Sequence, residues 1–507
     1  MKSLCRNRWK IGASCSALLL CASAFAQSEA GAAARKWRQN HELPIVQEFS
    51  RLLEIPNIAR DLPNIRRNAA LIREMLEKRG VKTQLLEVPD VPPVVFGEIV
   101  TPGAKQTIVF YAHYDGQPVE PKDWIGGQPF KAVLRSGGKD IPLPQPGQAF
   151  HPEWRLYARS TGDDKGTIIA QMAALDALHA AGVKLKSNIK FFYEGEEEGG
   201  SPHVDSILRK YKNLLGADLW LFCDGPVHQN RQQQITFGAR GTMGLNIIVY
   251  GPKRELHSGH YGNWAPNPAW TLTHLLTSMK DMEGKVLVQD FYKDVEPYGA
   301  LEKQAIAEGP NFEGELKDEL WLHSTEGGAR LEERIGQPSM NIRGLESAGV
   351  GAQSRNVIPT MATASIDIRL VKGMDHKVTA GRVLEHIRRQ GFYVVTGREP
   401  TEEERKTHSR VAQVNVSDGY NASRIAMDHP QALRVVKAVE AARGKVVRLP
   451  MSGGSVPMSV FENVLGAPLI SIPIANHDNN QHSYNENIRI QNLWDGIETM
   501  AALLAME

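Results

Sequence analysis

The sequence predicts an α/β protein with a second, separate α+β unit. Three observations support this prediction. The chain has 507 residues, which is more than one domain at roughly 100–200 residues per domain. Its first half alternates short apolar runs with helical patterns, as α/β folds do. Between residues 233 and 404, alternating strands are followed by helices, which indicates a separate α+β unit.

The composition restricts the class of protein. Hydrophobic residues make up 42% of the chain and charged residues 23%, which is typical of a soluble globular protein and not of a disordered, collagenous or coiled-coil chain. The formal net charge of +2 gives no basic excess of the kind that nucleic-acid binding requires. Beyond the N-terminus, no apolar run approaches the ~20 residues of a membrane span. We therefore expect no nucleic-acid partner and no stable membrane insertion.

Residues 1–26 have the layout of a cleaved secretory signal peptide. Four basic residues precede an uncharged stretch that begins at Ile11 and ends in the small-x-small pattern Ala24-Phe25-Ala26. The alternative is an uncleaved membrane anchor, for which sixteen residues are short. We therefore expect a secreted or periplasmic protein. Cleavage would remove four positive charges, so that +2 − 4 gives −2, and would leave Cys223 as the only cysteine, without a disulfide.

The elements before residue 233 follow from hydrophobic periodicity. Residues 27–40 are polar and predict a flexible lead-in. The stretch 116–155 is rich in Gly and Pro and predicts a long loop, and long loops in compact domains are often functional. The regular elements expected here are helices over 63–79 and 165–181 and strands over 82–88, 94–100, 107–112, 188–193 and 218–223.

The chain is expected to leave this first unit and later return to it. The inserted unit is predicted over 233–404, and the charged segment 399–406 is its expected exit linker. The first unit thus comprises residues 27–232 and 405–507. The expected elements are strands over 234–250, 361–371 and 468–472 and helices over 268–279, 375–390, 430–442 and 488–505.

Three apolar strands end in polar clusters. His113 and Asp115 follow one strand, the acidic run 194–198 follows the next, and Asp224 follows the third. In open α/β sheets, ligands bind at the carboxyl ends of the strands. Imidazole and carboxylate are the common non-sulfur ligands of zinc, so the conjunction predicts a metal site. Each cluster taken alone has an ordinary structural explanation, such as a core histidine, a solvated helix start or a turn.

At these positions the sequence resembles the M20 metallopeptidases, a di-zinc group that includes carnosinase-like dipeptidases, aminoacylases and deacetylases. The resemblance covers essentially the whole chain after residue 26. It implies an α/β, zinc-peptidase-like catalytic domain, in which a mixed sheet is flanked by helices, with an inserted α+β lid or dimerisation domain. It rests on nine motifs in the family's order. They are YAHYDGQP (111–118), STGDDKG (160–166), EGEEEGGS (194–201), FCDG (222–225), LHSG (256–259), SRNVIP (354–359), IDIRLV (366–371), SGGSVP (452–457) and NNQHSYNE (479–486).

The resemblance implies a ligand set for two zinc ions. His113, Asp163 and Asp224 would hold one ion. Asp163, Glu198 and His482 would hold the other, so Asp163 would bridge the two cations and offset their repulsion. In the family, the peptide bond after the bridging aspartate is often cis. Co²⁺ or Mn²⁺ could occupy the same nitrogen and oxygen ligands.

The resemblance also implies a general base. Glu197 lies beside the ligand Glu198, so it could reach the water between the metals without being a ligand itself. Asp115, two residues after His113, would accept a hydrogen bond from the imidazole and fix its tautomer. The other glutamates of the run 194–198 are expected to be solvated or structural.

Five further residues are implied to act on the substrate. His257 in LHSG resembles the lid histidine that stabilises the developing oxyanion, often across a dimer interface, so we expect a homodimer. Asn356 and Arg369 match positions that bind polar groups, and a guanidinium can hold a free carboxylate through two hydrogen bonds. Gly454 and Ser455 would line the substrate cleft.

The implied activity is that of an exported di-zinc peptidase, which would hydrolyse dipeptides or small peptides with metal-activated water and Glu197 as base. The alternative is an N-acyl-amino-acid deacylase. Asp at position 224 goes with dipeptidase, aminopeptidase or aminoacylase action in the family rather than with carboxypeptidase action. A non-catalytic binding homologue is disfavoured, because the five ligands and Glu197 are all present. The chain departs from the family at Lys372, where proline is usual.

Overall fold

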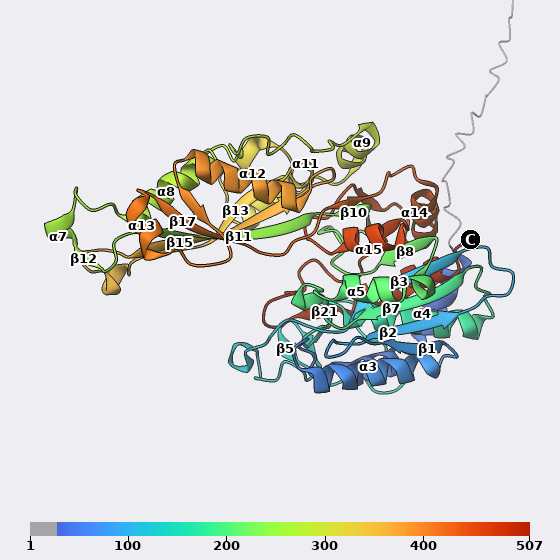
Figure 1. Cartoon of the computed structure of the whole chain (residues 1–507). Coiled ribbons are helices and arrows are strands. Elements are labelled where there is room, and N and C mark those ends of the chain that lie inside the picture. The colour runs from blue at the N-terminus through green and yellow to red at the C-terminus, as the bar shows by residue number, and fades with distance from the viewer. Residues whose placement is uncertain (1–27) are drawn as a thin grey trace, which may run out of the picture.

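The computed structural model describes residues 28–507, so the predicted signal peptide over 1–26 lies outside the described residues (Figure 1). One structural unit is built on an eight-stranded sheet, and a second, elongated unit is built on a five-stranded sheet. Helices accompany both sheets. The predicted fold class, a mixed α/β protein with a second unit inserted in the chain, is therefore confirmed.

The eight-stranded sheet is mixed. Its central strands are β7 (Asn188–Glu194), β3 (Thr107–His113) and β8 (Leu219–Phe222), which run parallel to one another. Antiparallel strands extend it past β7, and both parallel and antiparallel pairs extend it past β8. These outer strands are β2 (Val94–Ile99) and β1 (Lys82–Leu86) on one side, and β20 (Leu469–Ser471), β9 (Gln234–Thr236) and β19 (Val447–Leu449) on the other.

Both faces of this sheet are buried. Along β3, Ile108 and Phe110 belong to one apolar core, whereas Val109 and Tyr111 belong to another, because successive strand residues point to opposite faces. The first core contains residues of α1 (Glu29–Gln39), α2 (Glu42–Leu53), α3 (Leu62–Glu77), α4 (Lys165–Ala181), α14 (Pro430–Arg443) and α16 (Ile490–Leu504). The second contains residues of α5 (Val204–Lys210), α6 (Lys212–Leu215) and α15 (Met458–Leu465).

Two segments are more ordered than the sequence predicts. The expected flexible lead-in contains helix α1, in which Ala34 is fully buried and Arg35 donates two hydrogen bonds to Glu498, 2.9 and 2.7 Å long. The polar composition concealed this helix because its fully buried positions are small residues such as Ala34, and ion pairs add to their packing. The expected loop 116–155 contains the 3₁₀ turn η1 (Pro121–Asp123), β4 (Val133–Ser136), β5 (Lys139–Asp140) and the first residue of β6 (Arg155–Tyr157). These strands, which are too short to give a period, form a four-stranded sheet with β21 (Asn487–Arg489).

The inserted unit is an antiparallel sheet with one parallel edge pair. Its strand order is β13 (Ser339–Glu346), β15 (Met361–Leu370), β11 (Gly241–Tyr250), β17 (Val411–Val416) and β16 (Tyr393–Val395). Ile366 and Ile368 on β15 point to a core that contains residues of α8 (Pro268–Met279) and α12 (His376–Arg389). The sheet thus spans 241–416, while the predicted range of the unit is 233–404 and β9 lies in the large sheet.

Short elements complete the inserted unit. The segment expected as a linker, 399–406, contains α13 (Glu402–Thr407), which a capping box between Thr401 and Glu404 begins. At the end farthest from the large sheet, β12 (Leu256–His257) and α7 (Ser258–Tyr261) project together (Figure 1). The others are α9 (Ala300–Glu308), α10 (Glu313–Glu319), η3 (Glu326–Gly328), α11 (Leu331–Ile335), η4 (Gly351–Gln353) and β14 (Val357–Ile358).

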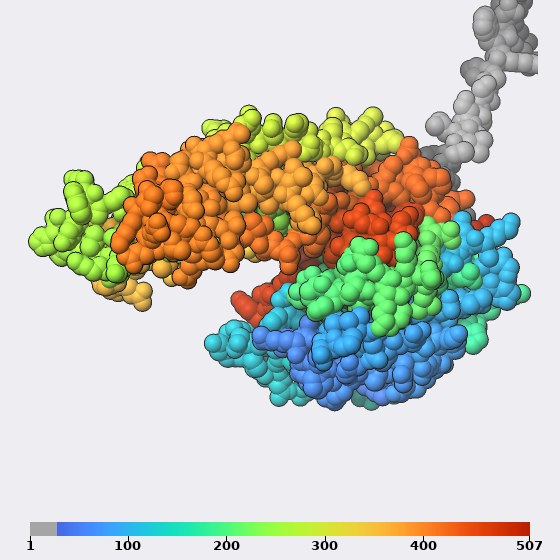
Figure 2. Space-filling model, in the orientation of Figure 1, coloured from blue at the N-terminus to red at the C-terminus, as the bar shows by residue number. Residues whose placement is uncertain are grey.

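The two units are joined by paired segments of chain. Strand β10 (Gly238–Ala239) leads into the inserted sheet and pairs with β18 (Ser423–Arg424), which leads out of it. A Cβ atom at Gly238 would collide with the backbone of Ser423, so only glycine permits this close approach. Helix α9 also contacts β19 of the large sheet, and an open recess lies between the two units on one side of the molecule (Figure 2). None of the helices in the described part of the chain is long and apolar enough to cross a membrane.

Candidate metal centre and active site

The three central strands of the large sheet deliver acidic and imidazole side chains to one edge. Because β7, β3 and β8 are parallel neighbours, their carboxyl ends meet at that edge. His113 is the last residue of β3, and Asp224 follows β8 by two residues. Glu197 and Glu198 begin the 3₁₀ turn η2 (Glu197–Gly199), shortly after β7 ends. These residues therefore lie at the ends of the strands that they were expected to follow.

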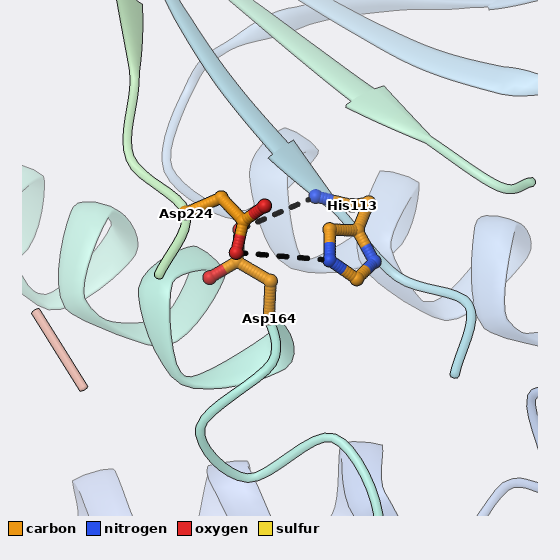
Figure 3. A group of neighbouring side chains, drawn as sticks. All are labelled: His113, Asp164 and Asp224. Carbon is orange, nitrogen blue, oxygen red and sulfur yellow. Dashed lines mark hydrogen bonds and ion pairs between the residues drawn. The ribbon is translucent and has the colours of Figure 1, made fainter. Parts of the chain in front are cut away.

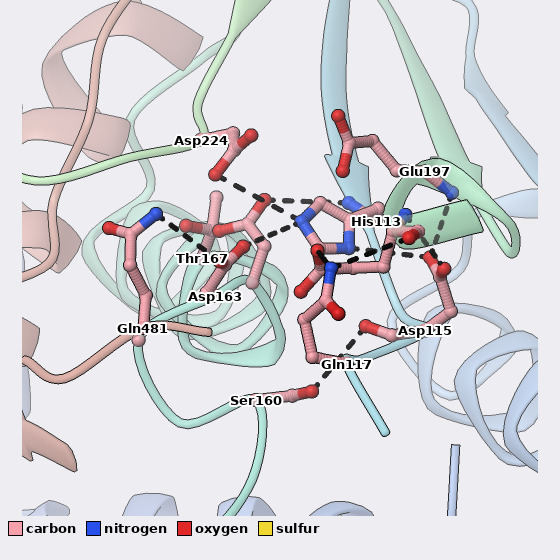
Figure 4. Close-up of polar contacts among 12 residues, drawn as sticks. His113, Asp115, Gln117, Ser160, Asp163, Thr167, Glu197, Asp224 and Gln481 are labelled. Atoms are coloured by element: carbon pink, nitrogen blue, oxygen red, sulfur yellow. Dashed lines mark hydrogen bonds and ion pairs between the residues drawn. The ribbon is translucent and has the colours of Figure 1, made fainter. Parts of the chain in front are cut away.

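Asp163 lies between two histidines. Its Oδ1 is 2.8 Å from His113 Nε2, and its Oδ2 is 3.2 Å from His482 Nε2. His482 Nε2 is also 3.1 Å from Glu198 Oε2, and His113 Nε2 is 4.0 Å from Asp224 Oδ1. The structure thus brings together all five predicted ligands, although they come from segments more than 300 residues apart in the chain. Figure 4 shows His113, Asp163 and Asp224 of this group.

By distance alone, the candidate ligands beside His113 include Asp164 instead of Asp163. The donor atoms of His113, Asp164 and Asp224 lie within 4.8 Å of one another (Figure 3). The donor atoms of Asp163, Glu198 and His482 form a second group within the same distance. However, Asp164 is fully buried and accepts a 3.4 Å hydrogen bond from the backbone N–H of His113. Burial, reinforced by the charge of Asp224, raises the pKa of Asp164 well above its usual range. Of these two aspartates, Asp163 is the one that contacts both histidines, and the peptide bond that follows it is cis.

The pKa values of the cluster residues are shifted because several carboxylates and imidazoles lie close together in a buried site. Burial, reinforced by Asp163, raises the pKa of Asp224 to about 7. Burial alone would lower the pKa of His113, but the neighbouring carboxylates of Asp115 and Asp163 offset it and hold the pKa well above its usual value. Hydrogen bonds with Asp163 and Glu198 raise the pKa of His482 to about 11. Acidic and imidazole side chains thus lie within hydrogen-bonding distance of one another in this cluster.

Asp115 anchors the turn that carries the two glutamates. Its Oδ1 and Oδ2 accept hydrogen bonds from the backbone N–H groups of Glu197 and Glu198, at 3.1 and 2.9 Å. Its Oδ1 also lies 3.4 Å from His113 Nδ1, a buried atom without a well-formed hydrogen bond. Asp115 thus contacts the predicted base, a predicted ligand and the imidazole, and not the imidazole alone.

The geometry separates the glutamates of the acidic run. Glu194 is buried and accepts a 2.8 Å hydrogen bond from the Tyr111 hydroxyl. Glu196 is buried and accepts hydrogen bonds from the backbone N–H and the ring of His203, both 2.9 Å long. Glu197 lies at the metal cluster, where burial, with Asp224 and other acidic neighbours, raises its pKa well above the usual range (Figure 4). The two glutamates left at the cluster are Glu197 and Glu198.

The predicted substrate residues fall into two groups. The Arg369 guanidinium donates a 2.6 Å hydrogen bond to Ser455 Oγ and a 3.2 Å hydrogen bond to Asp367. Gly454, beside Ser455, is exposed. His257 and Asn356 are both exposed and lie together at the far end of the inserted unit, where β12 pairs with β14. The structure therefore places these two residues away from the metal cluster of the same chain (Figure 1).

Three polar residues at the cluster were missed by the sequence argument. Gln117 Nε2 donates a 2.7 Å hydrogen bond to Glu198 Oε2, and Gln481 Nε2 donates a 3.3 Å hydrogen bond to Asp163 Oδ2. Glu486 accepts hydrogen bonds from the backbone beside Asp163. All three lie within the motifs 111–118 and 479–486, which were the available signal. Cys223, expected to form no disulfide, is a buried free thiol.

Comparisons with known protein families, sequences and structures all point to the same peptidase family. The model of peptidase family M20/M25/M40 matches residues 109–506. The chain is 26% identical to the Cys-Gly metallodipeptidase DUG1 of Saccharomyces cerevisiae, over 90% of this chain and 95% of that protein. It is also 26% identical to the human Beta-Ala-His dipeptidase, over 86% and 83%. The M20 family metallo-carboxypeptidase Sso-CP2 from Sulfolobus solfataricus superimposes with a TM-score of 0.75, at 26% identity and over 91% and 98% of the two chains.

One prediction is corrected by these relatives. The sequence argument expected a secreted or periplasmic protein, on the basis of residues that the structure does not describe. The Cys-Gly metallodipeptidases of three yeasts, matched over about nine tenths of the chain, are cytosolic enzymes. A basic, then apolar N-terminus therefore did not justify the prediction of export.

The family model covers most of the chain, and the matched residues include every member of the metal cluster. The two relatives compared by sequence are dipeptidases, one of them a metallodipeptidase by name, and acidic and imidazole side chains converge where the sheet ends. The chain therefore belongs to peptidase family M20/M25/M40 and is a metal-dependent hydrolase.

Proposed function

We propose that this protein is a di-zinc metallodipeptidase, which hydrolyses the amide bond of dipeptides or other small peptides. The observation that carries the proposal is the position of Asp163 between His113 and His482, at 2.8 and 3.2 Å. The names of the relatives, Cys-Gly metallodipeptidase and Beta-Ala-His dipeptidase, support dipeptides as the substrate class.

The donor set fits divalent cations. Burial raises the pKa of Asp224 to about 7, and a bound cation would stabilise the ionised carboxylates that now crowd one another. His113, Asp163 and Asp224 would hold one ion. Asp163, Glu198 and His482 would hold the other, with Asp163 as the bridge. The nitrogen and oxygen donors suit zinc, and Co²⁺ or Mn²⁺ would fit the same set.

Glu197 would be the general base. When bound, the metal ions would polarise the scissile carbonyl and lower the pKa of the attacking water. Glu197 takes the proton from this water and returns it to the leaving amine. Its burial favours this role, because a desolvated carboxylate is a stronger base than a solvated one. Asp115 holds the base in place through the backbone N–H of Glu197, 3.1 Å away.

Arg369 would bind the free carboxylate of the substrate. A guanidinium can donate two parallel hydrogen bonds to a carboxylate, which fixes its orientation. Ser455 and Asp367 hold the Arg369 side chain through hydrogen bonds of 2.6 and 3.2 Å. Gly454 and Ser455 would form the adjoining wall of the substrate cleft.

His257 and Asn356 would act on the substrate of a second copy of the chain. Both are exposed at the end of the inserted unit that is farthest from the large sheet (Figure 1). A homodimer would allow this end to reach the metal cluster of the partner, where His257 could stabilise the developing oxyanion. This arrangement makes the dimer the active form.

The experiment that tests the proposal is a substrate screen with zinc-loaded protein. We expect dipeptides with a free carboxylate to be hydrolysed with kcat/KM at least ~100-fold above that of the matching dipeptide amides, because the amides lack the group that Arg369 binds. Tripeptides and N-acetyl amino acids are assayed beside them. Hydrolysis of N-acetyl amino acids alone would replace the dipeptidase by the deacylase, and no hydrolysis in any class would reject both.

A further inference from the structure

The carboxylate of Glu486 is enclosed beneath the metal cluster. The side chain is fully buried. Its Oε1 accepts hydrogen bonds from the backbone N–H groups of Gly162 and Asp163, at 2.9 and 3.0 Å. Its Oε2 accepts from the backbone N–H of Ser160 at 2.8 Å and from Arg159 Nη1 at 2.9 Å. Four donors therefore converge on one carboxylate, and three of them are backbone N–H groups of the loop that carries Asp163.

This loop depends on an acceptor from outside. Residues 158–164 connect β6 to α4 without regular structure, and Ser160 has a left-handed φ of 65°. The loop is buried, so its N–H groups need hydrogen-bond acceptors. Glu486 supplies these acceptors for Ser160, Gly162 and Asp163 together. A carboxylate suits the position because it accepts at both oxygens, whereas a glutamine side chain would aim N–H donors at N–H donors.

The same carboxylate fixes the loop relative to His482. Glu486 follows His482 by four residues in the chain. The turn between them is closed by hydrogen bonds from Asn487 to the carbonyl of Asn479, 2.8 Å from the backbone N–H and 3.2 Å from the side chain. Asn487 also pairs with Tyr157 where β21 meets β6. One short segment thus carries His482 and also accepts the hydrogen bond of the Asp163 backbone N–H.

We propose that Glu486 is a positioning residue of the metal centre, which sets the bridging carboxylate of Asp163 at the correct place between His113 and His482. This inference rests on the proposed function of the site. Glu486 acts through the backbone of Asp163 and is not itself a ligand. Residues that orient metal ligands typically change metal affinity by 10–100-fold when they are replaced.

The experiment compares Glu486→Gln with Glu486→Asp and a matched control. Glu486→Gln keeps the shape but lets only one atom accept, and Glu486→Asp keeps the charge but is one methylene too short to reach all three N–H groups. Glu498→Gln is the control. Glu498 is also buried (2% exposed) and also accepts hydrogen bonds from arginines, Arg35 among them. It lies on α16, which packs against α1 and α14, and it does not contact the Asp163 loop. Circular dichroism first establishes that each variant is folded.

The first measurement is hydrogen exchange of the 158–165 peptide in the metal-free protein. We expect exchange at least about tenfold faster in Glu486→Gln than in wild type, because buried N–H groups lose their acceptor, and no change in Glu498→Gln. The second measurement is zinc affinity by competition with a chelating dye. We expect roughly 10–100-fold weaker binding in both Glu486 variants and wild-type affinity in Glu498→Gln.

The outcomes separate this inference from the proposed function. Wild-type zinc affinity in Glu486→Gln overturns the positioning role, whether or not the loop exchanges faster. If Glu486→Gln does not fold, Glu486→Asp carries both measurements, and wild-type values there overturn the role equally. If wild-type protein binds no zinc and cleaves no peptide, the proposed function fails, and unchanged exchange in the Glu486 variants would then reject the anchoring of the loop as well.

Discussion

At the scale of single residues, the carboxylate of Asp163 connects the two histidines through its two oxygens. An acid in this position must lose its charge, pair with cations or bind metals, because buried like charges repel. The imidazoles of His113 and His482 lie against its two oxygens. Metal ligands must be deprotonated, so affinity for metal is expected to rise with pH.

Glu197→Gln tests the general base. The variant should retain its bound metal, because Glu197 is not among the proposed ligands, but kcat should fall by about 10²–10⁴-fold, since the amide cannot accept the proton. Steady-state kinetics and elemental analysis on the same preparation check both expectations. Glu196→Gln is the control, because Glu196 is bound to His203, and it should remain within about threefold of wild type. Full activity of Glu197→Gln would remove Glu197 from the mechanism.

Glu198→Ala and His482→Ala test the ligand set. Each removes one donor from the same proposed ion, so each variant should hold about one metal ion per chain instead of two and should lose activity. Elemental analysis after dialysis, followed by assays with added Zn²⁺, measures both effects. His203→Ala, which removes a half-exposed histidine outside the cluster, should keep the full metal content. Two zinc ions in His482→Ala would show that the ligand set is wrong.

At the scale of elements, the segment 476–489 contributes to the metal site in two ways. It carries His482, and it pairs through β21 with β6, the strand that leads to the Asp163 loop. Asp478 stabilises this segment, because it accepts hydrogen bonds from Asn476 at 2.8 Å and from Arg489 at 3.2 Å and pairs with Arg155. Burial alone would raise the pKa of Asp478, but Arg155 and Asn476 lower it to about 2.

Asp478→Asn should therefore weaken the protein in a pH-dependent way. A folded-state pKa of about 2, below the ordinary 3.8, means that the stabilisation is complete above pH ~4 and is lost as the pH falls through about 2. Because the side chain is 39% exposed, we expect a loss of only about 0.5–1 kcal/mol at pH 7. Urea unfolding of both proteins between pH 7 and 3 measures the difference, which should narrow below pH 4.

The control for this experiment is Asp205→Asn, which breaks an exposed pair with Arg209 on α5. It should change the free energy of unfolding by less than about 0.5 kcal/mol at every pH. A constant difference between wild type and Asp478→Asn over the whole pH range would contradict the assigned role of Asp478.

At the scale of the whole molecule, the two units carry different parts of the proposed machinery. The metal cluster lies at the edge of the large sheet, whereas His257 lies at the distant end of the inserted unit (Figure 1). A single chain in this conformation does not bring the two together. A symmetric dimer would, because each inserted unit could serve the partner's site.

Mixing two inactive variants tests this arrangement. In a mixed dimer of Glu197→Gln and His257→Ala chains, one site combines an intact Glu197 with the intact His257 of the other chain. After random exchange of subunits, about half the dimers are mixed and each has one complete site of two, so about a quarter of wild-type activity should return. Sedimentation establishes that the dimer forms. The absence of recovered activity in confirmed mixed dimers would reject the shared site.

The sequence was informative where side-chain patterns are local. Helix α4 has the predicted bounds, and β3, β7 and β8 differ from the predicted strands by at most one residue at each end, because long apolar runs and glycine boundaries identify buried elements. The predictions of a flexible lead-in over 27–40 and, in part, of a loop over 116–155 were wrong. Helix α1 and the short strands in these ranges are stabilised by contacts with distant segments. Such contacts leave no period in the sequence.

By itself the sequence determined the strands, the residue types at their ends and the family to which they belong, because apolar periodicity and motif order are written along the chain. Only the tertiary structure decided that Asp163 contacts both His113 and His482, that the predicted lid residue His257 lies far from them, and that Glu486 holds the Asp163 loop. These relations join residues up to about 370 positions apart, and their distances depend on how the sheets and loops pack in three dimensions.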